Sequence, residues 1–250
     1  MTDLAVLGGS GLSTLEGLRI IGEHRQKTPY GEASAPLTLG SYAGKEIIFM
    51  PRHGHPHVIP PHKVNYRANL WALKENGVQR IISINAVGGI TGPMRPCRLV
   101  IPDQIIDYTW GRPGTFFEDG LASVTHVDFT RPYNDALRIL LIDTAEKIKL
   151  DIYPTGTYGV TQGPRLESAA EIKRLERDGC DIVGMTGMPE AALARELDLQ
   201  YASISVVVNW AAGKSAGMIT MAIIEENIKT GMESVRTLLK AVIRDLATPA

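Results

Sequence analysis

Short apolar runs recur along the chain, and they are rich in branched side chains. Most are followed by glycine, proline or asparagine, which is the pattern of buried strands that end in turns. The pattern predicts six strands, over residues 4–7, 47–50, 81–84, 99–101, 182–185 and 204–208.

Helical patterns lie between several of these strands. Gly77 and Gly179 follow two of them, and Pro189 stands at the start of a third, positions where these residues commonly end or begin helices. The predicted helices cover residues 64–76, 134–150, 168–178, 190–198 and 221–246. The alternation predicts an α/β fold. Because no repeat, low-complexity tract or linker divides the chain, we expect one domain over residues 1–250.

The composition narrows the class of protein. The chain has 250 residues, 44% hydrophobic and 21% charged, with a formal net charge of -1, and it can bury one large core. Nothing in it offers a basic field for nucleic acid or a polybasic stretch for a membrane. The start, Met1-Thr2-Asp3-Leu4, lacks a signal-peptide pattern, and no apolar run reaches the length of a membrane span. We therefore expect a cytoplasmic protein.

Two glycine-rich or basic segments follow predicted strands. The turn Gly8-Gly9-Ser10-Gly11 can present backbone N–H groups and a hydroxyl to an anion, although a plain tight turn explains it equally well. A dinucleotide fingerprint would require a small residue where Thr14 stands, so that interpretation is disfavoured.

The second segment, Arg52-His53-Gly54-His55-Pro56-His57, combines one permanent cation with three imidazoles. Zinc is a weaker interpretation, because the histidines have neither helical i, i+4 spacing nor a cysteine partner nearby. Cys97 and Cys180 are too few and too unpatterned for a zinc site or a disulfide framework. A guanidinium can present two parallel donors to two oxygens, so Arg52 suits phosphate better.

Further polar residues follow or adjoin other strands. They stand in Asn85-Ala86-Val87-Gly88-Gly89, Gly163-Pro164-Arg165-Leu166-Glu167 and Met185-Thr186-Gly187-Met188-Pro189-Glu190. Each motif alone is typical of turns and caps. Open α/β sheets build their ligand crevice at the carboxyl ends of strands, so together the motifs predict a binding site there.

At these residues the chain resembles the trimeric purine nucleoside phosphorylases, and within them the methylthioadenosine branch, over essentially its whole length. The matching blocks are Gly8-Gly9-Ser10-Gly11-Leu12, Thr28-Pro29-Tyr30-Gly31, Arg52-His53-Gly54, Lys63-Val64-Asn65-Tyr66-Arg67-Ala68-Asn69, Asn85-Ala86-Val87-Gly88, Gly163-Pro164-Arg165 and Met185-Thr186 with Pro189-Glu190. The resemblance implies a distorted mixed central β-sheet surrounded by helices and a homotrimer. It also implies a pentosyltransferase that needs no metal or cofactor and uses inorganic phosphate as co-substrate.

The same resemblance implies which residues hold phosphate and ribose. The apolar side chain of Met185 is expected to pack against the sugar. By position, the phosphate site falls on Ser10, Arg52, His53, Asn85, Ala86 and Thr186, the alanine through its backbone. A bound and oriented anion would gain much of its reactivity from position alone.

The expected base-reading residues are Asn209 and Glu167. Similar enzymes that take 6-aminopurines carry Asp-x-Asp where this chain has Asn209 and Ala211. An asparagine can accept from N7–H and also donate to a 6-oxo group. By resemblance, Glu167 aligns with the glutamate that accepts from N1–H of 6-oxopurines. Taken without the family, Asn209 would be a strand-end residue and Glu167 a helix N-terminal acid.

The 5' side of the sugar is expected to meet Met221 and Ile224. Inosine and guanosine phosphorylases that resemble this chain have a histidine there, whereas an apolar wall suits a methylthio group. His57 is a candidate for the same pocket. By resemblance, His126 closes the pocket of a neighbouring subunit.

These features together predict S-methyl-5'-thioinosine as the substrate. The alternatives are an inosine/guanosine phosphorylase and a methylthioadenosine phosphorylase with a relaxed base site. A hydrolytic nucleosidase is a different reaction class, which Arg52 and the rest of the expected anion site disfavour. A non-catalytic nucleoside-binding protein stays open because fold does not dictate function.

Overall fold

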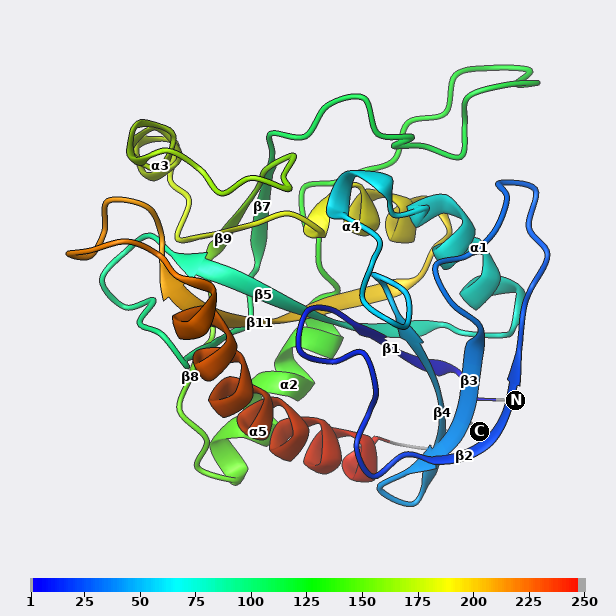
Figure 1. The fold of residues 1–250 in the computed structure, drawn as a ribbon. Helices are drawn as coiled ribbons and strands as arrows, with labels where there is room; N and C mark the ends of the chain where they lie inside the picture. The colour runs from blue at the N-terminus through cyan, green and yellow to red at the C-terminus, as the bar shows by residue number, and fades with distance from the viewer. Residues whose placement is uncertain (1, 247–250) are drawn as a thin grey trace.

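The computed structural model describes residues 2–246, so the two ends of the expected domain, residue 1 and residues 247–250, lie outside the described residues. Within that range, one mixed sheet of eleven strands runs through the molecule (Figure 1). Its main path, in spatial order, is β2 (Arg19–His24), β3 (Leu37–Tyr42), β4 (Lys45–Pro51), β1 (Leu4–Gly8), β5 (Arg80–Gly89), β10 (Ile182–Gly184), β9 (Thr157–Val160) and β7 (Gln104–Asp107). The remaining strands, β11 (Gln200–Trp210), β6 (Leu99–Val100) and β8 (Ile152–Tyr153), branch from β5.

The sheet divides at β5, and this division creates the space for a site. One edge of β5 pairs along its length with β11 in parallel. On the other edge, β1 pairs in parallel as far as Ser83, and β10 pairs antiparallel from Gly88 onward. Residues 84–87 therefore have no strand partner on that edge. Where neighbouring strands diverge in this way, α/β proteins commonly bind their ligands.

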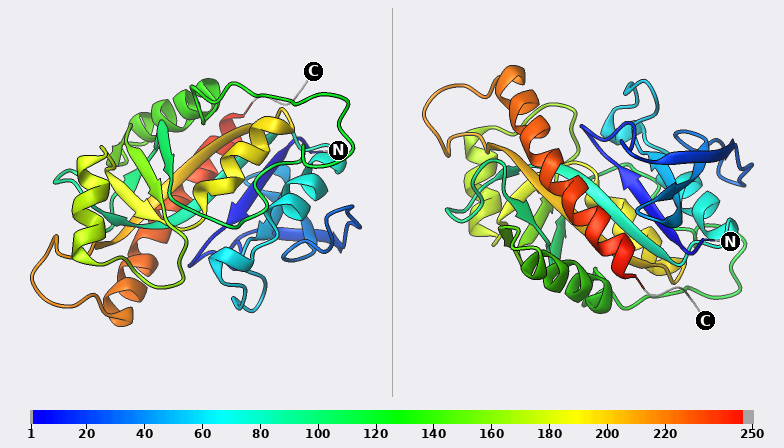
Figure 2. Two further views of the ribbon diagram at one scale, coloured as in Figure 1. Left: turned by 90° about the horizontal axis from the view of Figure 1, so that it is seen from above. Right: turned by 90° about the horizontal axis from the view of Figure 1, so that it is seen from below.

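Helices cover both faces of the sheet. On one face, α1 (Tyr66–Glu75) packs beside α4 (Gly187–Glu196), and on the other face α2 (Asp135–Lys147) packs beside α5 (Met221–Asp245) (Figures 1 and 2). The fifth helix of the described residues, α3 (Ala169–Arg177), lies beyond β9, and a short 3-10 turn covers Pro61–Lys63. Two large apolar clusters fill the layers between sheet and helices. The expectation of an α/β fold with a distorted mixed sheet surrounded by helices is confirmed.

Local capping chemistry explains where most of these helices begin. Asn65 and Asn134 accept hydrogen bonds from backbone N–H groups in the first turns of α1 and α2. Ser168 forms a reciprocal capping box with Glu171 at α3, and Thr220 caps α5. Such caps satisfy donors that a helix leaves free at its start.

The structure differs from the predicted elements in strand number and in strand extent, because eleven strands form where six were predicted. The strands β5 and β11 are longer than expected, so residues 85–89 and Asn209 lie inside strands rather than after them. Their mutual pairing extends both, with a register shift between Val207 and Asn209 that sets Asn209 opposite Gly88. The apolar-run criterion missed β2, in which every residue is exposed, and the short β7 and β8, which have no fully buried residue. It also missed β3 and β9, because glycine and polar residues interrupt their apolar positions.

The turn after β1 packs tightly against β5, which gives a test of the fold near the site. A Cβ atom at Gly9 would lie 2.4 Å from the carbonyl oxygen of Ile84 and 3.1 Å from Nη1 of Arg52. Gly9→Ala is therefore expected to lower the free energy of unfolding by about 1–3 kcal/mol, as overpacking does, and to reduce activity. Gly92→Ala is the matched control, because a Cβ there meets no atom within 4 Å. Equal stability of the two variants in urea unfolding would contradict this packing.

Candidate active site

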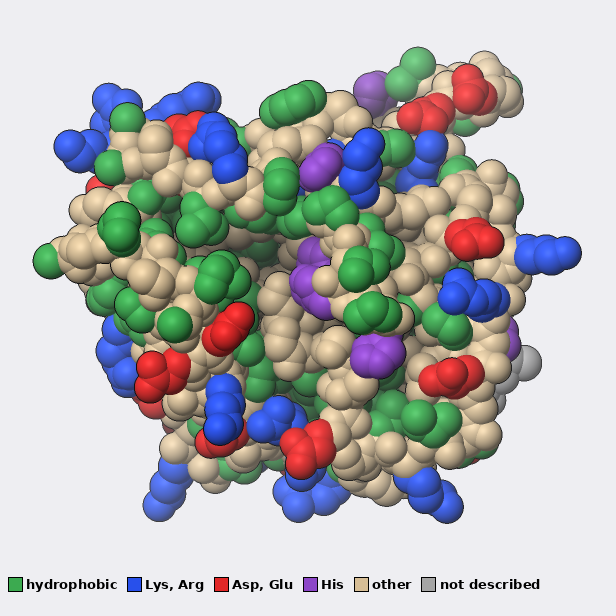
Figure 3. Space-filling view, viewed as in Figure 1, with side chains coloured by type: hydrophobic (Ala, Val, Ile, Leu, Met, Phe, Trp, Pro, Cys, Tyr) green, Lys and Arg blue, Asp and Glu red, His purple; other side chains and the backbone are tan. Residues whose placement is uncertain are grey.

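A cavity of about 610 Å³ opens at the divided edge of β5. Its volume falls in the range of small-molecule sites. Figure 3 shows this face of the molecule hollowed near its centre, with apolar and histidine side chains around the opening. The expected site residues that line the cavity are Ser10, His53, His57, Asn85, Ala86, Glu167, Met185, Thr186, Asn209, Met221 and Ile224.

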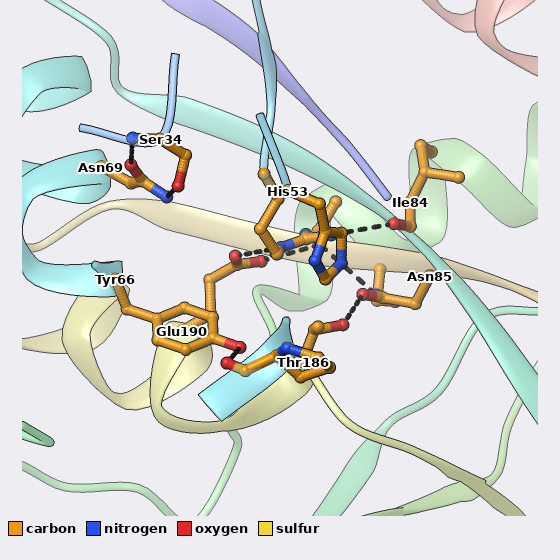
Figure 4. A network of polar contacts seen from close by, with 12 residues as sticks. Ser34, His53, Tyr66, Asn69, Ile84, Asn85, Thr186 and Glu190 are labelled. Carbon is orange, nitrogen blue, oxygen red and sulfur yellow. Dashed lines mark hydrogen bonds and ion pairs between the residues drawn. The ribbon is translucent and has the colours of Figure 1, made fainter. Parts of the chain in front are cut away.

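Asn85 and Thr186 are locked together at the end of the cavity expected to hold phosphate (Figure 4). The Thr186 hydroxyl donates to Oδ1 of Asn85 over 2.8 Å. Nδ2 of Asn85 donates to the hydroxyl of buried Ser203 over 2.7 Å. These bonds fix the orientation of both side chains before any ligand arrives, which preorganises the site.

Arg52 differs most from its expected place, because its guanidinium lies behind the cavity wall. The residue is 0% exposed. Nε and Nη2 donate to the two carboxylate oxygens of Glu190 over 2.6 and 2.7 Å, and Nη1 donates to the carbonyl of Ile84 over 3.2 Å. The expectation of a side chain devoted to the anion is therefore wrong. A direct contact of Arg52 with phosphate stays a prediction.

Glu190 is the centre of this buried network and was given no role from the sequence. It is 0% exposed, and besides Arg52 it accepts hydrogen bonds from Ser83 and Tyr201, each over 2.8 Å. Burial opposes charge on Arg52, but attraction to Glu190 outweighs it and raises the pKa of the guanidinium above its ordinary value. Burial, and then the charge of Glu190, raise the pKa of Tyr201, so this phenol remains a donor.

His53 faces the cavity as a neutral imidazole. Its Nδ1 lies 2.8 Å from the carbonyl oxygen of Ile59, and a carbonyl can only accept, so Nδ1 carries the proton. Burial and the neighbouring charge of Arg52 lower the pKa of His53 to about 4. The ring of His57 lies 4.4 Å away, centroid to centroid.

The two expected base-reading residues line the same cavity from different elements. Asn209 comes from β11, where its Nδ2 donates to the carbonyl of Trp210 over 2.7 Å. Glu167 stands before α3 and accepts a hydrogen bond from the Thr161 hydroxyl over 2.5 Å. The structure brings the two side chains to one cavity, while their roles toward a base stay predictions.

The start of α5 forms the apolar wall expected on the 5' side. Ile219, Met221 and Ile224 line the cavity, and Met221 is 65% exposed at its rim. The Thr220 hydroxyl between them is occupied as the helix cap. His126 is not among the cavity residues of the described chain. It is exposed, in the segment after β7 that arches away from the sheet (Figure 1).

Arg112 connects two parts of the site and was missed, because nothing in the pattern around it distinguishes it from a loop arginine. Nη1 donates to the carbonyls of Met185 and Met188 over 2.8 and 2.6 Å. Nη2 donates to the carbonyl of Gln162 over 2.8 Å. One cation thus joins the segment before Glu167 to the segment that carries Met185 and Thr186.

Residues 2–246 contain no group of three or more histidine, cysteine, aspartate or glutamate side chains that could hold a metal ion. Within the same residues, no helix is long and apolar enough to span a membrane.

Comparisons with known proteins agree with this architecture. The chain matches the model of the phosphorylase superfamily over residues 3–244. A Pseudomonas syringae pv. tomato protein named probable S-methyl-5'-thioinosine phosphorylase is 54% identical, over 97% of this chain and 99% of its own. The 6-oxopurine nucleoside phosphorylase of Pyrococcus furiosus is 46% identical over 97% and 92%.

A solved structure of methylthioadenosine phosphorylase from Schistosoma mansoni, in complex with adenine, has a TM-score of 0.93 to this structure. It is 31% identical, and the match covers 97% of this chain and 91% of that one. The fold is that of the nucleoside phosphorylases, an α/β class of pentosyltransferases. The chain belongs to the phosphorylase superfamily, which confirms the resemblance seen in its motifs.

The neutral state of His53 makes stability depend on pH. Between its ordinary pKa of 6.5 and about 4, the unfolded chain binds a proton that the folded chain refuses, so stability falls as pH falls through this window. The full effect is about 3 kcal/mol at pH 4, and none of it is present above pH 7. Urea unfolding of wild type and His53→Gln between pH 7.5 and 4 measures it.

The free energy of unfolding of His53→Gln should depend less on pH than that of wild type. His55→Gln serves as the control, because His55 is exposed on the same loop and its variant should keep the wild-type slope. An unchanged slope in His53→Gln would remove His53 as the source.

Proposed function

We propose that the protein cleaves S-methyl-5'-thioinosine with inorganic phosphate, giving hypoxanthine and 5-methylthio-α-D-ribose 1-phosphate. One observation carries the proposal: three groups of side chains line a single cavity. The first group is Asn85 and Thr186, the second is the Glu167 carboxylate with the Asn209 amide, and the third is the apolar start of α5. These three groups correspond to the phosphate, the 6-oxopurine and the methylthio group.

The reaction is a direct displacement at the anomeric carbon of the sugar. An oxygen of hydrogen phosphate forms the new bond to this carbon as the bond to N9 of the purine breaks, and the electron pair of that bond leaves with the base. The proton that hydrogen phosphate loses is balanced by the proton that the departing base takes up at N7 from solvent. The sugar gains positive charge and the base negative charge on the way. The protein's part is to orient the phosphate and to hydrogen-bond the departing purine, which lowers the barrier without a protein nucleophile.

The donors and acceptors of the base fit the proposed pair of residues. In a 6-oxopurine, N1 carries a hydrogen and O6 accepts, so the Glu167 carboxyl oxygens can accept from N1–H. Asn209 can donate to O6 and accept from N7–H once the departing base is protonated at N7. Adenine presents a lone pair at N1 and an amine at position 6. The names of relatives such as the Pseudomonas syringae and Pyrococcus furiosus proteins support the 6-oxopurine assignment.

We also propose the co-substrate, the oligomeric state and the location of the enzyme. Phosphate is a co-substrate, and no metal or cofactor takes part. The active unit is a homotrimer in the cytoplasm, in which His126 reaches the 5' pocket of a neighbouring subunit. The exposed position of His126, away from this chain's own cavity, is consistent with that role.

A second candidate function is phosphorolysis of inosine or guanosine. It is favoured by relatives named 6-oxopurine nucleoside phosphorylase, which are 45–46% identical to this chain. The apolar wall of Ile219, Met221 and Ile224 opposes it, because these three side chains offer no hydrogen-bond partner to a 5'-hydroxyl.

A side-by-side assay of three nucleosides separates these functions. With phosphate present, kcat/KM for methylthioinosine should exceed that for inosine by roughly 10- to 100-fold, the range expected when a pocket accepts an apolar group but leaves a hydroxyl unpaired. Methylthioadenosine should be the poorer of the two methylthio substrates. Omitting phosphate should stop base release, whereas a hydrolase would continue.

The results of this assay distinguish the candidate functions. Equal turnover of inosine and methylthioinosine would overturn the 5' assignment, and preference for methylthioadenosine would overturn the base assignment. Nucleoside binding without turnover would mean a binding protein.

Base selection is tested by Asn209→Asp, alone and with Ala211→Asp, which together introduce the Asp-x-Asp pattern of the 6-aminopurine enzymes. A carboxylate that faces O6 is repulsive and cannot replace the amide donor, so the loss on methylthioinosine should be about 1–3 kcal/mol of transition-state stabilisation. Activity on methylthioadenosine should fall less or rise. The KM for phosphate is the internal control. An unchanged base preference in the double variant would exclude Asn209 from base reading.

A further inference from the structure

Thr161 occupies a fixed position behind Glu167. It directly follows β9, and its backbone N–H donates to the carbonyl of Gly184 over 2.8 Å. On its other side, Nη2 of Arg112 lies 3.3 Å from the Thr161 carbonyl and also holds the carbonyl of Gln162. The backbone of Thr161 is therefore anchored to the segment that leads into Met185 and Thr186.

Through its side chain, the anchored Thr161 also holds Glu167 in place. The two residues are separated by the turn at Gly163-Pro164, and the Thr161 hydroxyl spans it to reach Oε1 of Glu167 over 2.5 Å. The carbonyl of Gly184 is a second acceptor within reach, but at 3.3 Å. A hydroxyl has one proton to donate, and the shorter bond to a carboxylate is the stronger one. Among the described residues, no other group donates to Glu167.

We propose that Thr161 is a specificity-determining positioning residue, which holds the Glu167 carboxylate as an acceptor aimed at N1–H of a 6-oxopurine. Thr161 is not part of the cavity lining in the described chain, so it acts through Glu167 and does not touch the base. The inference rests on the proposed function and extends it by one residue.

The orientation of the Glu167 carboxylate decides which base it can bind. A held carboxylate offers only lone pairs to the base, which pair with N1–H of hypoxanthine and oppose the lone pair at N1 of adenine. A carboxylate that is free to rotate can turn away from N1–H and lose this discrimination. Loss of the Thr161 hydroxyl should therefore harm 6-oxo substrates more than 6-amino substrates.

Thr161→Val tests this, because valine keeps the branched shape and removes the donor. We expect kcat/KM for methylthioinosine to fall about 10-fold, as for a lost hydrogen bond to a charged group, and the ratio over methylthioadenosine to shrink at least fivefold. Thr161→Ser retains the hydroxyl and should retain the base preference. Thr161→Ala gives a second donor-free variant in case valine does not fold.

A double-mutant cycle with Glu167→Gln separates positioning from general damage. If Thr161 acts through Glu167, Thr161→Val should not change the base preference further in the Glu167→Gln background. The KM for phosphate should stay within about twofold of wild type in every variant, because residues of the phosphate end are unchanged.

The inference is overturned if the donor-free variants keep the wild-type base preference, if they lose both methylthio substrates equally, or if the effects of the two substitutions simply add. Failure of the proposed function would appear earlier, as a wild type that does not prefer methylthioinosine or as Glu167→Gln with no effect on base preference. The two failures are therefore distinguishable.

Discussion

The buried ion pair of Arg52 and Glu190 is the interaction on which the site depends. It joins the end of β4 to α4 and, through hydrogen bonds to Ser83 and Tyr201, to β5 and β11. Two charges removed from water are tolerated only when geometry and hydrogen bonds compensate them. Here both carboxylate oxygens and three guanidinium nitrogens have partners, so the pair fixes four elements in one arrangement.

This arrangement changes how Arg52 can be studied. If the residue only touched phosphate, its removal would be a clean measure of anion binding. Because Glu190 is fully buried, truncating Arg52 would leave an uncompensated carboxylate in the core, a perturbation of about 3–5 kcal/mol. A loss of phosphate affinity in such a variant would therefore combine a missing contact with a displaced α4, whose first residues adjoin Thr186.

Local chemistry explains which parts of the structure could be predicted from the sequence. Caps such as Asn134 and Ser168 act within a few residues, so the starts of the four helices with side-chain caps are predicted to within two residues. The start of α4, which has no side-chain cap, lies three residues before the predicted one. Buried runs identified the central strands, but β2 has no buried face and left no such signal. The residues with roles through distant partners, Glu190, Arg112 and Thr161, could not be found, because their partners come together only in the folded sheet.

The sheet register determines how the two ends of the cavity are related. Asn85 lies opposite Ser205, and Gly88 lies opposite Asn209 after the bulge, so both ends are mounted on the same pair of strands. Three residues of strand separate the two levels by about 10 Å. Backbone pairing between the two strands fixes the distance between the two ends of the cavity more firmly than loops would. The side chains at 167, 209 and 211 can therefore change with the base without changing that distance. Substitution at those positions can change which purine is read while the phosphate end keeps its geometry.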